Sequence, residues 1–139
     1  MNVQVAVDPG YEPSDKEEFM NPRQKAYFRQ KLVAWKESLL DQSQDTVRMM
    51  QADTTNIPDL ADRASVETDR ALELRTRDRQ RKLIAKIDAA IRRIDDGSYG
   101  YCEVTGEPIA LKRLAARPIA TLSLEAQEMH ERRERIHRD

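Results

Sequence analysis

The chain has 139 residues, a formal net charge of −1, 35% charged residues and only 5% aromatic residues. This length suits one ordinary domain, or a small core with a long extension, and the composition favours long exposed helices over sheet. The balanced charge argues against a general nucleic-acid-binding protein, so we expect no direct sequence-specific binding of DNA. A single cysteine excludes an internal disulfide and fits a reducing compartment.

Residues 1–20 contain Pro9, Gly10 and Pro13 without a sustained period, which predicts a mobile N-terminal segment. The first ten residues lack the charged start and the long apolar run of a secretory signal, and no later stretch reaches membrane-spanning length. We therefore expect a soluble, cytoplasmic protein with no membrane partner.

The first predicted helix begins at Pro22, because Asn21 can cap a helix whose first position is a proline. Its apolar residues recur at alternating steps of four and three, which indicates a coiled-coil seam. The apolar members are Phe28, Leu32, Trp35 and Leu39, and the same register continues through Gln42, Thr46 and Met49. The seam is thus expected to become more polar along the helix.

Asn56 and Pro58 favour a turn, and Asp59 or Asp62 can cap a second helix that runs to Gly97. Its predicted stripe contains Leu83, Ile87, Ala90 and Ile94, with Ser65, Asp69, Leu72 and Thr76 earlier on the same face. Residues 21–97 therefore predict a long antiparallel helical hairpin with an acidic tip near residues 53–62.

Residues 98–139 contain the remnant of a zinc ribbon. Cys102 stands where two C-x2-C knuckles would place a first ligand, and the other three positions hold Thr105, Ser123 and Ala126. We expect no zinc, with hydrogen bonds from Ser and Thr and packing of Ala126 in its place. Other apolar residues are expected to supply a core: Leu111, Leu114, Ile119, Leu122 and Met129. Cys102 fits a small buried side chain better than a redox-sensing thiol.

A short helical turn is predicted before Pro118, and Ser123 can cap a last helix. His130 and His137 lie on the charged face of that helix, where we expect solvated side chains.

Several segments resemble the DksA/TraR family of RNA polymerase-binding transcription regulators. In the ribbon these are GYC at 100–102, Gly106, Ile109 and RLAARP at 113–118; in the hairpin they are NIPDLADRA and LELRTRDRQRKLIAKI. The resemblance covers roughly residues 20–130. It implies a mainly α fold, in which the long antiparallel hairpin is joined to a small globular domain with a zinc-finger-like ribbon and a C-terminal helix.

The resemblance also implies a partner and a role. In the family, the hairpin enters the secondary channel of RNA polymerase, and its tip acts beside the catalytic centre without cleaving a bond. The matching tip residues are Asp59, Asp62 and Ala64. The expected function is regulation of initiation, such as repression of ribosomal RNA promoters, together with guanosine tetraphosphate (ppGpp) in the stringent response. The protein is not expected to be an enzyme.

The resemblance also bears on two further sets of residues, for docking on polymerase and for alarmone binding. Arg75, Arg79 and Lys82 lie with Lys86 along one helix face; such a run is commonly a solvated flank, and the resemblance favours docking on polymerase. Leu83, Lys86 and Arg117 match the family's alarmone-binding positions, where Lys and Arg suit phosphate. Gln127 stands where the family pattern has a lysine, so a positive charge is missing there.

Two alternatives remain open. A transcript-cleavage factor also inserts an acidic hairpin tip into the channel, where it helps to hold a second magnesium ion; metal-dependent shortening of a stalled transcript would favour it. A structural coiled-coil adaptor would instead self-associate through the seam from Phe28 to Leu39 and would not bind polymerase.

Overall fold

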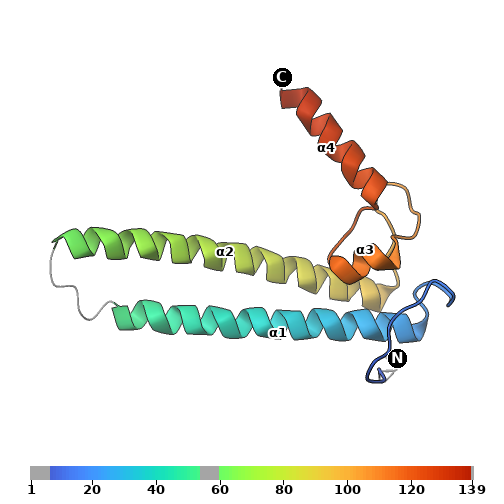
Figure 1. Cartoon of the computed structure of the whole chain (residues 1–139), viewed down its shortest axis with the longest axis horizontal. Helices are drawn as coiled ribbons and strands as arrows, with labels where there is room; N and C mark the ends of the chain where they lie inside the picture. Colours follow the sequence, from blue (N-terminus) through green and yellow to red (C-terminus); the bar gives the residue numbers. More distant parts are fainter. Residues whose placement is uncertain (1–6, 54–59, 139) are drawn as a thin grey trace. The chain divides into compact units, whose positions relative to one another are not determined.

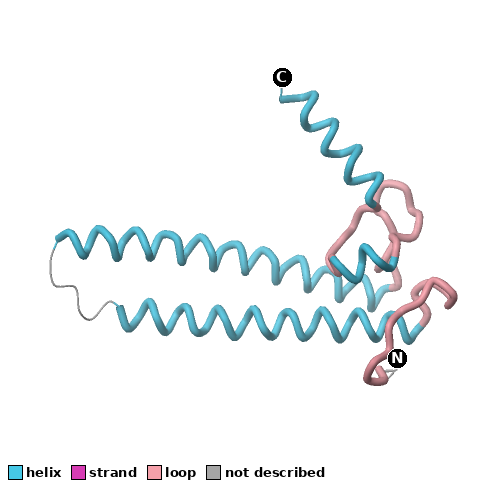
Figure 2. The backbone as a smooth tube through the Cα atoms, viewed as in Figure 1, coloured by secondary structure: helices cyan, strands magenta, loops and turns pink. Residues whose placement is uncertain are grey.

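The computed structural model describes residues 7–53 and 60–138, which form a mainly helical protein (Figure 1). The helices are α1 (Pro22–Asp53), α2 (Leu60–Asp96), α3 (Leu111–Ala116) and α4 (Leu124–Arg138). No strand occurs within these residues (Figure 2), and an isolated antiparallel bridge joins Tyr101 and Pro108 in the remnant of the zinc ribbon. The expected mainly α class is confirmed.

The chain divides into two compact units. One contains Met1–Val33 and Ala89–Asp139, and the other is the continuous segment Ala34–Asp88. Both long helices contribute to both units.

The start of α1 follows from its capping residues. The Oδ1 atom of Asn21 accepts a 2.9 Å hydrogen bond from the backbone N–H of Gln24, as the sequence predicts. The Gln24 side chain is fully buried, and its Oε1 atom accepts a 2.8 Å bond from the N–H of Met20. The side chain of Asn21 therefore satisfies one N–H group that the helix leaves free, and the side chain of Gln24 satisfies the N–H of Met20 just before the helix.

The end of α2 is formed by Gly97. This residue has φ of 88°, and the N–H of Ser98 donates a 2.9 Å hydrogen bond to the carbonyl oxygen of Arg93. A left-handed glycine followed by such a bond is a common way to satisfy the last carbonyl groups of a helix. The predicted end at Gly97 is confirmed.

Contacts in the second unit show that α1 and α2 are antiparallel. In the second unit, Lys36 lies 2.7 Å from Asp88, and Gln42 accepts a hydrogen bond from Gln80. Moving forward along α1 therefore moves backward along α2. In the first unit, Arg29 on α1 and Asp95 on α2 form a 3.3 Å ion pair. The expected antiparallel hairpin is confirmed.

The apolar seam agrees with the prediction in part. Phe28, Leu32, Ile87 and Ala90 have no exposed surface, and Leu39 and Ile94 are also buried. Burying one such large side chain contributes about 1.5–3 kcal/mol. Trp35 and Leu83 are half-buried. These positions are those that the sequence assigns to the seam.

Beyond these positions the predicted register agrees only at Thr46, which is half-buried, and is wrong elsewhere. Gln42 and Met49 are exposed, and so are Ser65, Asp69, Leu72 and Thr76 on α2. The half-buried positions in this part of the hairpin are Ser43, Thr46 and Val47 on α1 and Val66, Arg70, Glu73, Arg77, Asp78 and Gln80 on α2. On α1 the prediction used a 3.5-residue repeat, whereas a straight helix turns once in 3.6 residues, so its face drifts. On α2 the few apolar residues do not mark the inward face.

The C-terminal segment of the first unit has its own apolar core. Ile109 and Leu114 have no exposed surface, and Leu111 and Ala126 are buried. Ile119 and Leu122 are half-buried. The expected place of Met129 in this core is wrong, because its side chain is 53% exposed on α4.

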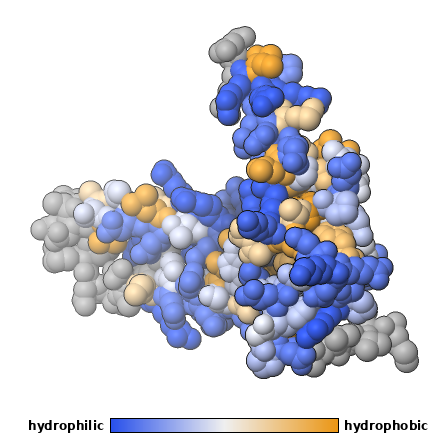
Figure 3. Space-filling view, turned by 45° about the vertical axis from the view of Figure 1, so that its right-hand side comes forward, coloured by the Kyte–Doolittle hydropathy of each residue, from blue (hydrophilic) through white to orange (hydrophobic). Residues whose placement is uncertain are grey.

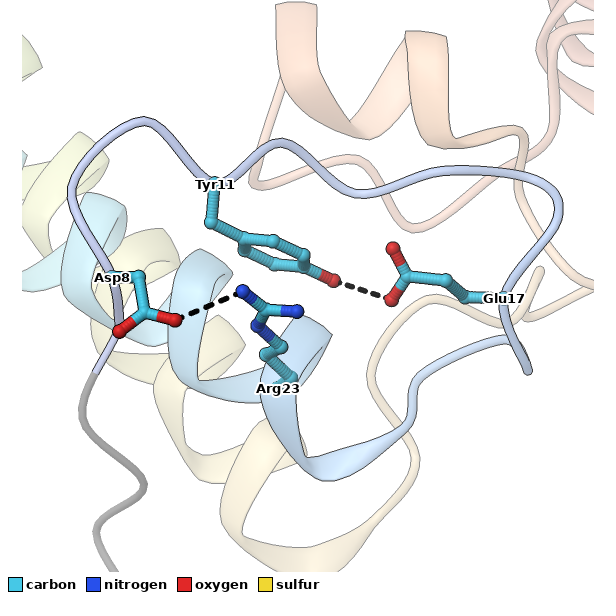
Figure 4. Close-up of polar contacts among 4 residues, drawn as sticks. All are labelled: Asp8, Tyr11, Glu17 and Arg23. Atoms are coloured by element: carbon cyan, nitrogen blue, oxygen red, sulfur yellow. Dashed lines mark hydrogen bonds and ion pairs between the residues drawn. The ribbon is translucent and has the colours of Figure 1, made fainter.

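Residues 8–20 contact the start of α1 (Figure 4). The hydroxyl group of Tyr11 donates a 2.7 Å hydrogen bond to Glu17, and Arg23 lies 3.0 Å from Asp8. The Arg23 guanidinium group also lies 4.0 Å from the centre of the Tyr11 ring. Burial, together with the hydrogen bond to Glu17, raises the pKa of Tyr11 to about 12. These contacts do not test whether residues 1–20 are mobile, so that mobility stays a prediction.

Candidate functional site

The acidic tip falls largely on residues that the structure leaves undescribed. Asp59 lies outside the described residues, directly before the first residue of α2. Asp62 lies in the first turn of α2, and its side chain is outside the description as well. Ala64 is described and exposed. The roles assigned to these three residues therefore stay predictions.

The expected docking residues form an exposed basic face on α2. Arg75, Arg79, Lys82 and Lys86 are all exposed on this one continuous helix. Asp78 partly neutralises the face, because its carboxylate lies 2.6 Å from Arg81 and 3.6 Å from Lys82. Within the described residues, no ion pair involves Arg75 or Arg79. These two arginines therefore keep their hydrogen-bond donors available for an acidic partner.

The expected alarmone residues occur in both units. Leu83 is half-buried and Lys86 is exposed in the second unit, whereas Arg117 is exposed in the first. Arg117 follows α3, and its N–H donates a 2.7 Å hydrogen bond to the carbonyl oxygen of Arg113. Each residue has a side chain suited to its proposed contact, and the assembly of the three into one site stays a prediction.

Gln127 lies near the start of α4. It is half-buried, and its Nε2 atom donates a 3.2 Å hydrogen bond to Glu131 on the next turn of the helix. A neutral amide in this place offers no charge to a phosphate group.

Cys102 lies in the remnant ribbon with only 2% of its surface exposed. Burial raises the pKa of its thiol, but hydrogen bonds outweigh this effect and lower the pKa to about 6. The donors are the hydroxyl group of Thr105 and the backbone N–H groups of Ser123, Thr105 and Val104. Together these hydrogen bonds favour the thiolate.

The other three ligand positions do not fit a zinc ion. Ala126 has no donor atom, and the Ser123 hydroxyl oxygen accepts a 3.2 Å hydrogen bond from the Ala126 N–H as the cap of α4. Thr105 has a hydroxyl group that bonds to Cys102. Among the described residues, no group of three or more His, Cys, Asp and Glu side chains is arranged to hold a metal. One thiolate cannot replace the four ligands of a structural zinc site.

Three side-chain hydrogen bonds, each between residues well separated in the sequence, hold the ribbon to its surroundings. Tyr99 donates to the carbonyl oxygen of Pro118, and Arg113 donates to that of Leu122, each at 2.8 Å. Lys31 on α1 donates to the carbonyl oxygen of Ala115 at the end of α3, also at 2.8 Å. Sequence reasoning missed these bonds, because their acceptors are backbone atoms that leave no signal in residue type.

Comparisons with known proteins agree with this arrangement of a hairpin followed by a ribbon. Residues 24–94 match the family model described as the DnaK suppressor protein DksA, N-terminal domain. Residues 97–132 match the model of the prokaryotic dksA/traR C4-type zinc finger. The chain belongs to the DksA family, as the resemblance in the sequence indicates.

Individual relatives cover nearly the whole chain. A protein from Caulobacter vibrioides is 70% identical over 129 residues, which is 93% of this chain and 91% of the relative. One from Escherichia coli is 44% identical over 131 residues, covering 94% of this chain and 86% of the relative. Both are named RNA polymerase-binding transcription factor DksA. The solved structure of the transcription factor DksA2 from Pseudomonas aeruginosa matches with a TM-score of 0.79 and 40% identity, over 84% of this chain and 90% of that one.

Proposed function

We propose that this protein is an RNA polymerase-binding transcription factor. The observation that carries the proposal is the 70% identity, over 93% of the chain, to a relative with that name. The relatives are named as factors rather than as enzymes, and this supports regulation over catalysis. None of the helices in the described part of the chain is long and apolar enough to cross a membrane. A cytoplasmic location is part of the proposal.

The hairpin of α1 and α2 enters the secondary channel of polymerase in this proposal. Asp59, Asp62 and Ala64 then act beside the catalytic centre and shift the balance among promoter complexes. A differential interaction of about 1–3 kcal/mol is enough to change such populations several-fold or more. Promoters with short-lived open complexes, such as those of ribosomal RNA, respond most strongly.

Guanosine tetraphosphate is the proposed effector at the interface with polymerase. Leu83, Lys86 and Arg117 are its proposed contacts, and the exposed cations at two of these positions support the assignment. The neutral Gln127 weakens phosphate binding relative to a lysine. No direct sequence-specific contact with DNA belongs to the proposed mechanism.

Docking is tested by comparing two single variants in a binding titration with core polymerase. Arg79 and Arg81 are exposed arginines on the same helix, and Arg81 pairs with Asp78 at 2.6 Å. We expect Arg79→Ala to weaken binding roughly tenfold, since a charge-assisted contact is worth about 1.5–3 kcal/mol. Arg81→Ala should bind almost as well as the unmodified chain. Equal loss in both variants, or no loss in either, would argue against docking through this face.

The cleavage-factor alternative is tested with a stalled elongation complex. A regulator leaves the transcript length unchanged, whereas a cleavage factor shortens the transcript in the presence of magnesium. We expect no shortening.

The adaptor alternative predicts self-association of the chain without any binding to polymerase. The binding titration with core polymerase excludes this alternative if the unmodified chain binds.

A further inference from the structure

One part of the hairpin, entirely within the second unit, has no buried side chain. We define this polar half as residues 40–49 of α1 and 63–82 of α2; every described side chain in it is half-buried or exposed. The rest of the second unit differs. It contains the buried Leu39 and Ile87, and an ion pair of 2.7 Å joins Lys36 to Asp88.

In the polar half, the large apolar side chains are exposed, whereas most of the half-buried side chains are polar or charged. Its large apolar side chains point outward: Leu40 is 42% exposed, Met49 64%, Leu72 54% and Leu74 52%. The half-buried positions are mostly polar or charged, namely Ser43, Thr46, Arg70, Glu73, Arg77, Asp78 and Gln80. Figure 3 shows exposed hydrophobic side chains among hydrophilic ones on the visible face of the molecule. Apolar burial therefore contributes little to pairing of the helices here.

Several inward polar atoms also lack partners. The Nε and Nη2 atoms of Arg70, the Nε atom of Arg77 and the Oε1 atom of Gln80 are buried without a hydrogen-bond partner in the described structure. Burying a charged donor without an acceptor opposes closure of the two helices. The hydrogen bond between Gln80 and Gln42 crosses the pair, but it is 3.4 Å long and exposed, so it adds little.

We infer that the polar half is a separately opening segment: its two helices part and pair again while the contacts around Leu39 and Ile87 stay closed. Opening exposes the guanidinium groups of Arg70 and Arg77 to water or to the acceptors of a partner surface. Local opening of this kind takes place where buried apolar contacts are few. The inference concerns the free protein and goes beyond the proposed polymerase-binding function, so it can be tested in the absence of polymerase.

Hydrogen–deuterium exchange of the isolated full chain provides the first test. Amides of residues 43–49 and 66–80 should exchange at least tenfold faster than those of residues 35–39 and 84–88. Both sets lie on the same two helices, so the difference in rate reports local opening. Equal rates in the two sets would overturn the inference.

A pair of matched double variants identifies the cause. Arg70→Leu with Arg77→Leu places apolar side chains at half-buried positions and removes the unpartnered donors, so exchange in the polar half should slow about tenfold. Arg75→Leu with Arg79→Leu makes the same changes at exposed positions of the same helix, and exchange should stay close to that of the unmodified chain. Leu and Arg have similar helix propensities, so helix formation itself is matched. Equal slowing in both variants, or no slowing in the first, would contradict the inference.

Discussion

The hydroxyl group of Tyr99 donates a buried 2.8 Å hydrogen bond to the carbonyl oxygen of Pro118, which lies 19 residues further along the chain. The Tyr99 side chain is 2% exposed, and its burial raises the pKa of the hydroxyl group. Tyr99 therefore stays a neutral donor at physiological pH. The bond fastens the start of the ribbon to the segment after α3, in a region where the residues do not fit a zinc ion.

Tyr99→Phe tests the contribution of this bond. The variant keeps the ring but leaves the buried carbonyl group of Pro118 without its donor, so the free energy of unfolding should fall by about 1–3 kcal/mol. Urea denaturation measures the loss. Tyr101→Phe removes a hydroxyl group from a side chain that is 39% exposed, and it should change stability by less than about 0.5 kcal/mol. Equal effects of the two changes would contradict the role of Tyr99.

Asn21→Ala tests the cap of α1. The variant loses the acceptor of the Gln24 N–H, and also the bond from the Asn21 side chain to the carbonyl oxygen of Glu18. The free energy of unfolding should fall by about 0.5–2 kcal/mol. Asn21→Ser keeps a capping oxygen and should retain most of the stability. A serine variant that is as unstable as the alanine variant would show that the cap is not the cause.

Cys102 predicts a specific dependence of stability on pH. Its pKa is lowered to about 6 in the folded chain, whereas an unfolded thiol titrates near its ordinary value of about 8.5. The resulting stabilisation is complete above the unfolded pKa and is lost as the pH falls through the folded pKa. Between pH 6 and pH 9 the contribution should rise by roughly 2–4 kcal/mol.

Cys102→Ser provides the control for this measurement. Unfolding of both chains by urea at pH 6, 7.5 and 9, with a reducing agent, measures the difference between them. The advantage of the unmodified chain should grow with pH, because serine does not ionise in this range. A difference that is independent of pH would contradict the lowered pKa.

Gln127→Lys tests the proposed alarmone site. Replacing the amide by an ammonium group adds a cation to a site that is proposed to bind a polyphosphate, so the response to guanosine tetraphosphate should occur at a roughly tenfold lower concentration. Transcription with increasing alarmone measures the shift. Glu131→Ala keeps residue 127 neutral and removes the acceptor of its hydrogen bond, so it is the control for loss of that bond. An unchanged response in Gln127→Lys would argue against the assignment.

Helix ends were predictable from the sequence because single residues determine them. Asn21 and Ser123 cap α1 and α4, and Gly97 ends α2, as their side chains or backbone freedom dictate. The apolar seam was predictable where large apolar residues repeat, as at Phe28 and Leu32. These signals come from residues close together in the sequence, so a single sequence is enough to predict the helix ends and this part of the seam.

The remaining features depend on distant contacts. The inward positions of Arg70 and Arg77 follow from how α2 is rotated within the pair, and no apolar residue in that stretch marks the face. The bonds from Tyr99 and Lys31 end on backbone carbonyl groups far along the chain. For the candidate site, exposure of Arg75 and the other basic residues was predictable from charge on a long helix, whereas their role was implied only by the family resemblance.

Transcription in vitro from a ribosomal RNA promoter tests the central claim most directly. The unmodified chain is compared with Asp62→Asn and with Asp69→Asn, a control at an exposed acid on the same helix, and binding to polymerase is measured in parallel. We predict that the unmodified chain and Asp69→Asn inhibit, more strongly with guanosine tetraphosphate, whereas Asp62→Asn binds polymerase without inhibiting. An unmodified chain that neither binds nor inhibits would contradict the claim that this DksA family member is a polymerase-binding transcription factor.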